Sequence, residues 1–140
     1  MEFNRLIPEL YVSDFEKSLS FYTGVLGFSI SFQRTEQSFA FLSLEGSQIM
    51  IMQYNPSGTW NTGALEYPYG RGINLAFQID NLDSIIQSLS NFNFPIKHGP
   101  KENRYRMGEA MLHNKEVLIL DPDGYLLRFL QHLGVKKMNE

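Results

Sequence analysis

Hydrophobic and polar residues alternate along several short runs of the chain, as they do in β-strands with one buried face. The pattern predicts strands over residues 6–12, 28–34, 38–44, 48–54, 73–79, 109–113, 116–120 and 125–131, and a short strand starting at 94–96. Two other stretches carry apolar residues at helical spacing. They predict helices over 13–26 and 80–92, with Ser13 as N-cap and Glu16 completing a capping box in the first.

Four stretches show neither the strand period nor the helix period. Residues 55–72 hold Trp60, Tyr67 and Tyr69 among glycines and prolines, so we expect a long loop, which in a compact domain is usually functional or mobile. Residues 97–107 are polar and are predicted to be a second loop. Asn114-Lys115 is predicted to be a turn between two strands, and residues 133–140 a polar tail that frays.

The order of strand, helix and three strands occurs twice. The segment Val12–Phe15 matches Ile79–Leu82, and at the same offset Leu19 matches Ile86. The simplest interpretation is a single α+β domain over residues 1–140, made of two βαβββ repeats at about 5–54 and 72–131 joined by loop 55–71. In each repeat the helix is expected to cover one face of the sheet, and the other faces are expected to be concave and form a cleft.

Alternation also predicts which side chains face that cleft. The helix-covered side is expected to be apolar throughout, with Leu10, Val12, Met50, Met52, Leu75, Phe77, Ile79, Leu127 and Phe129. Phe39 and Phe41 share one face of their strand and belong either to the core, which we favour, or to the wall of the cleft. The cleft side mixes apolar and polar groups, with Ile7, Glu9, Tyr11, Ile49, Ile51, Gln53, Asn74, Ala76, Gln78, Leu126, Arg128 and Leu130. Such a mixture is typical of a small-molecule pocket. Arg128 could pair with Glu9, lie in a dimer interface or bind a ligand, and the sequence does not choose among these roles.

Composition narrows the class of protein. The chain has 140 residues, of which 43% are hydrophobic, so it can bury a core. It has no cysteine, which excludes disulfides and thiolate metal sites. The net charge is −3 and the basic residues are scattered, which argues against a nucleic-acid partner. Without a membrane-span or signal-peptide pattern, we expect a cytoplasmic protein.

The segment Asp121-Pro122-Asp123-Gly124 has the residues of a tight turn before the last strand. With Tyr11–Ser18, Phe21-Tyr22 and Val25–Phe28 it resembles the vicinal oxygen chelate superfamily, which includes glyoxalase I, bleomycin-resistance proteins, fosfomycin-resistance enzymes and extradiol dioxygenases. The run Leu126–Phe129 and the segment 104–109 most resemble the bleomycin-resistance-like branch. Members of that branch are usually homodimers with ligand grooves at the interface, so a homodimer that binds a small molecule is what the resemblance implies.

Enzymes of this superfamily hold a divalent metal with His and Glu from four strands. The resemblance places those four positions on Ile7, Ile51, Asn74 and Arg128. Isoleucine has no donor atom, and the permanent charge of arginine repels a cation. We therefore expect no metal and no other cofactor in this cleft. The three histidines, His98, His113 and His132, are predicted to lie at the surface or at strand ends.

The sequence leads to three hypotheses. The first is a non-enzymatic protein that sequesters an aromatic or cationic ligand. The expected ligand-binding residues are Glu9, Tyr11, Gln53, Trp60, Tyr67, Tyr69, Asn74, Gln78 and Arg128, with the loop aromatics stacking on the ligand. The second is an enzyme, a lyase, isomerase or dioxygenase, in which Glu9 does acid–base work or binds a metal in an atypical site. The third is an interaction module whose cleft Ile7 and Ile51 close.

Overall fold

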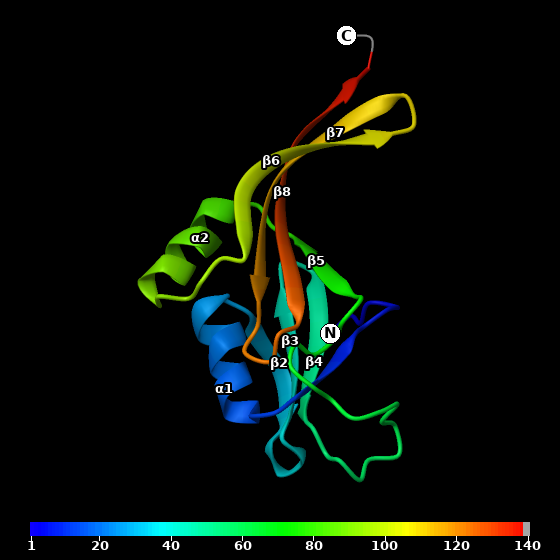
Figure 1. Ribbon diagram of the computed structural model, residues 1–140, viewed down its shortest axis with the longest axis vertical. Helices are drawn as coiled ribbons and strands as arrows, with labels where there is room; N and C mark the ends of the chain where they lie inside the picture. Colours follow the sequence, from blue (N-terminus) through cyan, green and yellow to red (C-terminus); the bar gives the residue numbers. More distant parts are fainter. Residues whose placement is uncertain (139–140) are drawn as a thin grey trace. The chain divides into compact units, whose positions relative to one another are not determined.

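The computed structural model describes residues 1–138, which divide into two compact units. Unit 1 consists of Met1–Arg71 together with Asp121–Tyr125, and unit 2 consists of Gly72–Leu120 together with the chain from Leu126 onward. Each unit has its own four-stranded sheet and its own helix (Figure 1). No helix in the described part of the chain is both long and apolar enough to cross a membrane.

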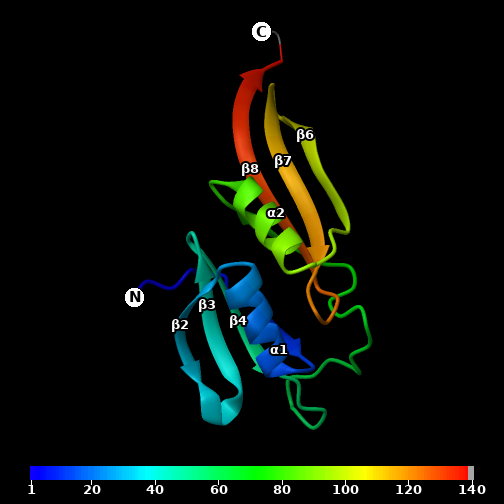
Figure 2. The same cartoon turned by 90° about the vertical axis from the view of Figure 1, so that its left-hand side faces the viewer.

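Unit 1 contains strands β1 (Glu9–Val12), β2 (Ser29–Arg34), β3 (Phe39–Leu44) and β4 (Ser47–Gln53). Helix α1 (Phe15–Ser20) continues as a π-helical segment η1 (Phe21–Val25), and a 3-10 turn η2 (Thr35–Gln37) joins β2 to β3. The strand order in the sheet is β1-β4-β3-β2, with β1 parallel to β4 and the other pairs antiparallel. The helix packs on one face of this sheet (Figure 2).

Unit 2 contains strands β5 (Asn74–Gln78), β6 (His98–Met107), β7 (Ala110–Leu120) and β8 (Leu126–Lys137), with helix α2 (Leu82–Asn91). Its strand order is β5-β8-β7-β6, with β5 parallel to β8. The order matches that of unit 1, with β5 to β8 in the places of β1 to β4. The predicted α+β fold of two βαβββ repeats is therefore confirmed.

The core of each unit lies between its helix and one face of its sheet. In unit 2, the helix buries Leu82, Ile85 and Leu89, and the strands supply Phe77 and Phe129, whose rings stack with centroids 5.2 Å apart. These are the helix-facing positions that alternation predicts. In unit 1, Leu10 and Val12 are buried as predicted, but β4 presents the opposite residues to the core.

The predicted face of β4 is wrong. Ile49 and Ile51 are 1% and 0% exposed and lie in the core, whereas Met50 and Met52 lie on the open face. The register shows why, since β1 runs parallel to β4 and pairs Glu9 with Met50, and paired residues share a face. The run Ile49–Met52 is apolar on both sides, so alternation alone does not distinguish its faces.

The start of α1 also differs from the prediction. Its N-cap is Asp14, whose carboxylate accepts a hydrogen bond from the Lys17 amide at 3.2 Å. Ser13 instead donates its backbone N–H to Asp123 at 2.9 Å, and its hydroxyl also binds that carboxylate. The capping box with Glu16 is therefore wrong, because the serine binds the turn and not its own helix.

Three predictions in unit 2 are wrong. Residues predicted as a loop form β6, the expected turn at Asn114-Lys115 lies inside the continuous strand β7, and the expected frayed tail continues β8 to Lys137. Residues 139–140 of that tail lie outside the described residues. The hairpin turns instead at Gly108, whose φ is +62°. Most of β6 and the end of β8 are exposed, so these strands show no apolar alternation.

Candidate functional site

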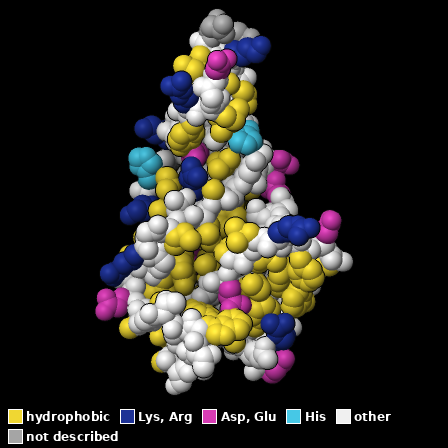
Figure 3. Space-filling view, turned by 90° about the vertical axis from the view of Figure 1, so that its right-hand side faces the viewer, with side chains coloured by type: hydrophobic (Ala, Val, Ile, Leu, Met, Phe, Trp, Pro, Cys, Tyr) yellow, Lys and Arg dark blue, Asp and Glu magenta, His cyan; other side chains and the backbone are white. Residues whose placement is uncertain are grey.

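A pocket of about 520 Å³, the unit 1 pocket, opens on the sheet face that α1 leaves uncovered. Glu9 and Tyr11 reach it from β1, Met50 and Met52 from β4, and Phe39 from β3. Residues 55–61 form its rim and add Trp60. Figure 3 shows the side of the molecule away from the helices, where hydrophobic side chains gather with single charged groups among them. The volume is that of a small-molecule site.

Glu9 is the one carboxylate among the residues that line this pocket. Desolvation by burial raises the pKa of Glu9, and the positive charge of Arg34 partly opposes that rise. The carboxylate stands among an aromatic ring and two thioethers, so little water solvates it. A cation that reached Glu9 would replace that missing solvation.

Arg34 shows how the aromatic wall of the pocket accepts positive charge. Its guanidinium carbon lies 4.0 Å from the centre of the Phe39 ring, which is cation–π geometry. Its Nε donates a hydrogen bond of 2.8 Å to Gln37 Oε1, which fixes the guanidinium over the ring. The sequence pattern does not select Arg34, because it lies at a strand end. For Phe39 the sequence favours the core and leaves the cleft wall as the alternative, and the structure places its ring in the pocket wall.

Trp60 stands on a tight turn at the rim. The Asn55 carbonyl accepts hydrogen bonds from the Gly58 amide at 2.9 Å and from Asn61 Nδ2 at 2.7 Å, which closes the turn locally. The indole is 77% exposed. A large exposed aromatic ring beside a pocket is available to cover a ligand.

Gln53 has a mainly structural role, although it touches the unit 1 pocket. Its Oε1 accepts the Phe15 amide at 3.0 Å and its Nε2 donates to the Ser13 carbonyl at 2.9 Å. Both bonds hold the start of α1. Gln53 therefore joins the helix to the edge of the pocket.

Tyr67 and Tyr69 do not line the unit 1 pocket. The Tyr69 ring packs edge-on against Tyr125, with centroids 5.8 Å apart, and its amide donates to the Asp123 carbonyl at 2.8 Å. Tyr67 lies beside Gly124 and is 60% exposed. Of the three loop aromatics that the sequence proposed as a roof, only Trp60 reaches the pocket.

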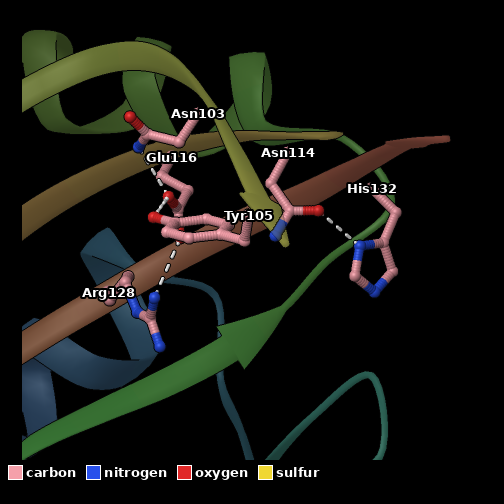
Figure 4. Close-up of polar contacts among 6 residues, drawn as sticks. All are labelled: Asn103, Tyr105, Asn114, Glu116, Arg128 and His132. Carbon is pink, nitrogen blue, oxygen red and sulfur yellow. Dashed lines mark hydrogen bonds and ion pairs between the residues drawn. The ribbon is translucent and has the colours of Figure 1, made fainter. Parts of the chain in front are cut away.

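The open face of the unit 2 sheet carries a polar cluster centred on Glu116 (Figure 4). Glu116 is only 2% exposed, because its partners lie over it. Its carboxylate accepts hydrogen bonds from Asn103 at 2.6 Å, from the Tyr105 hydroxyl and from Arg128 at 3.1 Å. The bond to Glu116, followed by burial, raises the pKa of Tyr105, and Arg128 opposes the rise.

Arg128 is therefore paired with Glu116, and not with Glu9 as the sequence left open. Arg128 and Gln78 line a shallower hollow of about 410 Å³ in unit 2, while Asn74 is exposed at the start of β5. The predicted site residues thus fall into separate groups. The unit 1 pocket takes Glu9, Tyr11, Gln53 and Trp60, and the unit 2 hollow takes Gln78 and Arg128.

Glu116 is a site residue that the sequence pattern did not select. A signal was present, since Glu116 is a lone carboxylate directly before the apolar run Val117–Leu120. A charge beside a core strand needs a partner, and Arg128 is the matching charge on the next strand.

Comparison with known proteins decides the family. Residues 3–129 match the family model of the Glyoxalase/Bleomycin resistance protein/Dioxygenase superfamily. The chain belongs to this superfamily. No curated protein matches the sequence significantly.

Solved structures of other proteins share this fold. A protein from the mobile metagenome of V. pseudocholerae is 22% identical with a TM-score of 0.68, and the match covers 94% of this chain and 96% of the other. A virulence protein from Salmonella typhimurium is 24% identical with a TM-score of 0.64, over 95% and 100% of the two chains. A lactoylglutathione lyase from Agrobacterium tumefaciens is 16% identical with a TM-score of 0.58, over 90% and 92%. At these identities the likeness shows the fold alone.

The metal of the superfamily's enzymes does not fit the corresponding residues of this member. Ile51 lies in the core of unit 1, and the residues beside it that face the pocket are methionines. Arg128 occupies another of these positions. It forms an ion pair with Glu116, and its positive charge would repel a metal cation. Across residues 1–138, no three His, Asp or Glu side chains come together in a group that could hold a metal ion.

Proposed function

We propose that this protein binds a small aromatic cation in the unit 1 pocket and sequesters it without chemical change, in the manner of the bleomycin-resistance-like branch of its superfamily. One observation carries the proposal. A half-buried carboxylate, Glu9, stands in a pocket whose walls are aromatic rings and thioethers, and one of those rings already stacks on a guanidinium. These are the groups that recognise a flat or quaternary cation.

The energetics of the pocket support a cationic ligand over a neutral or anionic one. Burial disfavours the ionised form of Glu9 more strongly than the Arg34 charge favours it, so a cation beside the carboxylate would be attracted to it and would offset the remaining desolvation. The thioethers of Met50 and Met52 adapt to ligands of different shape. Sequestration requires only affinity, so the lack of a fitting metal set is no obstacle to it.

Assembly and location complete the proposal. We propose that two copies form a homodimer, as is usual in that branch, and that the dimer acts in the cytoplasm, in keeping with a chain that has no cysteine. A role in antibiotic resistance would follow if the sequestered cation is a drug. Sedimentation of the purified protein tests the dimer independently of any ligand.

Trp60 provides a direct binding test, because it is the sole tryptophan of the chain and lies at the pocket rim. Titration with bleomycin and other aromatic cationic drugs should quench or shift its fluorescence saturably. A Phe39→Leu variant should weaken this response by removing one aromatic wall. A flat response to every member of the panel, with the protein folded, would contradict the drug-binding proposal.

A superfamily enzyme is the second candidate function, and the environment of Glu9 is the observation that favours it. A carboxylate with a raised pKa inside a pocket is suited to accept or donate a proton. Elemental analysis of protein purified without chelator separates the two candidates. A stoichiometric transition metal that leaves with the Glu9→Gln substitution would favour the enzyme.

A further inference from the structure

We propose that the open face of the unit 2 sheet is a second binding site, specific for a small monocarboxylate with a compact apolar body. The site is the 410 Å³ hollow in which Arg128 and Gln78 lie, called the unit 2 hollow here. It is built entirely from β5 to β8. The inference does not depend on the cation proposed for the unit 1 pocket.

The strand register places the polar residues of this site on one face. Ala76 on β5 pairs with Arg128 on β8, and Leu130 on β8 pairs with both Gln78 and Glu116. The opposite face is taken by Phe77 and Phe129, which pack towards α2. The face with Arg128 is therefore the one that no helix of unit 2 covers.

Glu116 serves to orient Arg128. Its three bonds come from Asn103, Tyr105 and Arg128, and the carboxylate is 2% exposed, so a ligand does not reach it. The ion pair joins one terminal nitrogen of the guanidinium to Glu116 Oε1. A guanidinium fixed at one edge in this way holds its other donors in a defined direction.

The guanidinium of Arg128 brings only donors to the site. Within residues 1–138, Arg128 Nε is buried and has no hydrogen-bond partner. The Arg128 side chain as a whole is 33% exposed. His132 Nδ1 donates a hydrogen bond of 2.6 Å to Asn114 Oδ1, so its Nε2, which is left for the hollow, is an acceptor in the neutral ring (Figure 4). The guanidinium donors that Glu116 does not bind are matched by a ligand that brings acceptor oxygens.

Charge and shape select a monocarboxylate. A guanidinium fork fits the two oxygens of a carboxylate, and Arg128 supplies a single positive charge that Glu116 already balances in part. A doubly charged phosphate would therefore be undercompensated, and a metal cation would meet donors that it does not bind. The apolar walls at Ala76, Leu112 and Leu130 leave room for a compact hydrocarbon body.

Benzoate and benzamide form a matched pair of probes, because they share size and shape and differ in charge. Heteronuclear NMR of the whole protein follows the Arg128 Nε–H signal during titration with each. Benzoate should shift this signal saturably and bind at least about tenfold more tightly than benzamide. Inorganic phosphate, added at the same pH, should leave the signal in place.

Two variants separate binding from folding. Arg128→Lys keeps the charge but loses the fork, and it should weaken benzoate binding by about tenfold. Where that variant fails to fold, the Arg128→Gln/Glu116→Gln double variant removes both charges without leaving either one buried alone, and should bind benzoate no better than benzamide. Trp60→Ala, in the unit 1 pocket, should bind benzoate as the wild type does.

Several results would overturn the inference. Equal affinity for benzoate and benzamide would show that the site does not recognise the negative charge. Undiminished benzoate binding by both Arg128 variants would show that Arg128 does not contact the ligand. Benzoate shifts confined to residues of the unit 1 pocket would place the carboxylate there. The first two results do not bear on whether an aromatic cation quenches Trp60, so the two proposals fail separately, whereas the third would also count against a cation site in the unit 1 pocket.

Discussion

Tyr22 donates a hydrogen bond of 2.6 Å from its hydroxyl to Asp121 Oδ2, and both side chains are buried. Asp121 begins the turn before β8, far along the chain from the helical segment that holds Tyr22. The same turn binds Ser13 through Asp123, and the Tyr125 hydroxyl donates to the Tyr11 carbonyl at 2.8 Å. The turn that carries the family resemblance is thus an integral part of unit 1.

Removal of the Tyr22 hydroxyl should destabilise the protein. In Tyr22→Phe the buried carboxylate loses a donor, for which we expect a cost of about 1–3 kcal/mol in unfolding free energy. Chemical denaturation measures it. Tyr67→Phe, on an exposed ring, is the control and should change stability by less than about 0.5 kcal/mol. Equal effects of the two substitutions would show that the bond to Asp121 contributes nothing.

Asp121 should make stability depend on pH in an unusual direction. Desolvation by burial raises the pKa of Asp121 from 3.8 to about 6, despite the opposing hydrogen bonds from Tyr22 and the turn amides. The folded state therefore binds the proton more tightly than the unfolded state. The contribution of this group is complete below pH 3.8 and is lost as pH rises through about 6.

Asp121→Asn isolates this contribution, because it changes one titrating group and leaves the others. The unfolding free energy of the wild type relative to the variant should fall by about 3 kcal/mol between acidic and neutral pH, at 1.4 kcal/mol for each unit of pKa. Denaturation of both proteins at several pH values measures the difference. A difference that stays constant over this range would contradict the raised pKa.

Gly124 allows the turn to approach residues 67–68. Its φ is +92°, and a Cβ there would lie 2.5 Å from both Cα and Cβ of Pro68. Gly46, at φ +87°, is a matched control because a Cβ there would meet nothing within 4 Å. Both alanine variants bear the cost of a positive φ, but Gly124→Ala should be less stable than Gly46→Ala by a further ~1–3 kcal/mol, measured by denaturation. Equal losses would mean that the loop moves away freely.

Removing one partner of the Glu116–Arg128 pair should lower stability strongly, whereas replacing both partners by apolar residues should change it little. Arg128→Met leaves Glu116 charged and 2% exposed, so we expect a loss of about 3–5 kcal/mol in denaturation. Glu116→Leu/Arg128→Met should recover most of it. Asp83→Asn breaks the exposed pair with Lys115 and, as a control, should cost less than about 1 kcal/mol. A double variant as unstable as Arg128→Met would mean that the network has a structural role beyond its charges.

The sequence predicts much of the fold, because one residue pattern occurs twice. The two helices, the order of elements and the turn at Asp121 all follow from local residue types, and Phe77 and Phe129 face the core as alternation requires. β4 is the counterexample. Ile49–Met52 is apolar on both sides, so its facing depends on pairing with β1, which is a non-local property.

The candidate site depends on which side chains of β4 point away from the core, so the sequence predicts the site only in part. Glu9 and Tyr11 lie in the unit 1 pocket as expected, whereas Met50, Met52 and Arg34 enter it through tertiary arrangement. In unit 2, most of β6 is exposed and polar and has no periodic signal, and on β7 Glu116 is a buried charge just before an apolar run, so alternation does not identify the hydrogen-bond network around Arg128. Tertiary pairing, and not propensity, decides these positions.

The acid range provides another test of the role of Glu9. Because burial raises the pKa of Glu9, its carboxylate should take up a proton at a higher pH than an ordinary glutamate does. Cation binding, followed by Trp60 fluorescence, should therefore weaken as the pH falls through that raised pKa. Glu9→Gln should bind weakly with no such dependence. A wild-type affinity that is unchanged across this range would argue against contact between Glu9 and the cation.

Calorimetric titration with phenyltrimethylammonium and with tert-butylbenzene tests the central claim most directly, because the two molecules have one shape and differ by one positive charge. The wild type should prefer the cation by at least about tenfold, or 1.4 kcal/mol. Glu9→Gln should lose most of that preference, while Glu16→Gln, on the exposed surface of α1, should keep it. Equal affinity of the wild type for the two molecules, or a preference that survives Glu9→Gln intact, would contradict a cation site at Glu9.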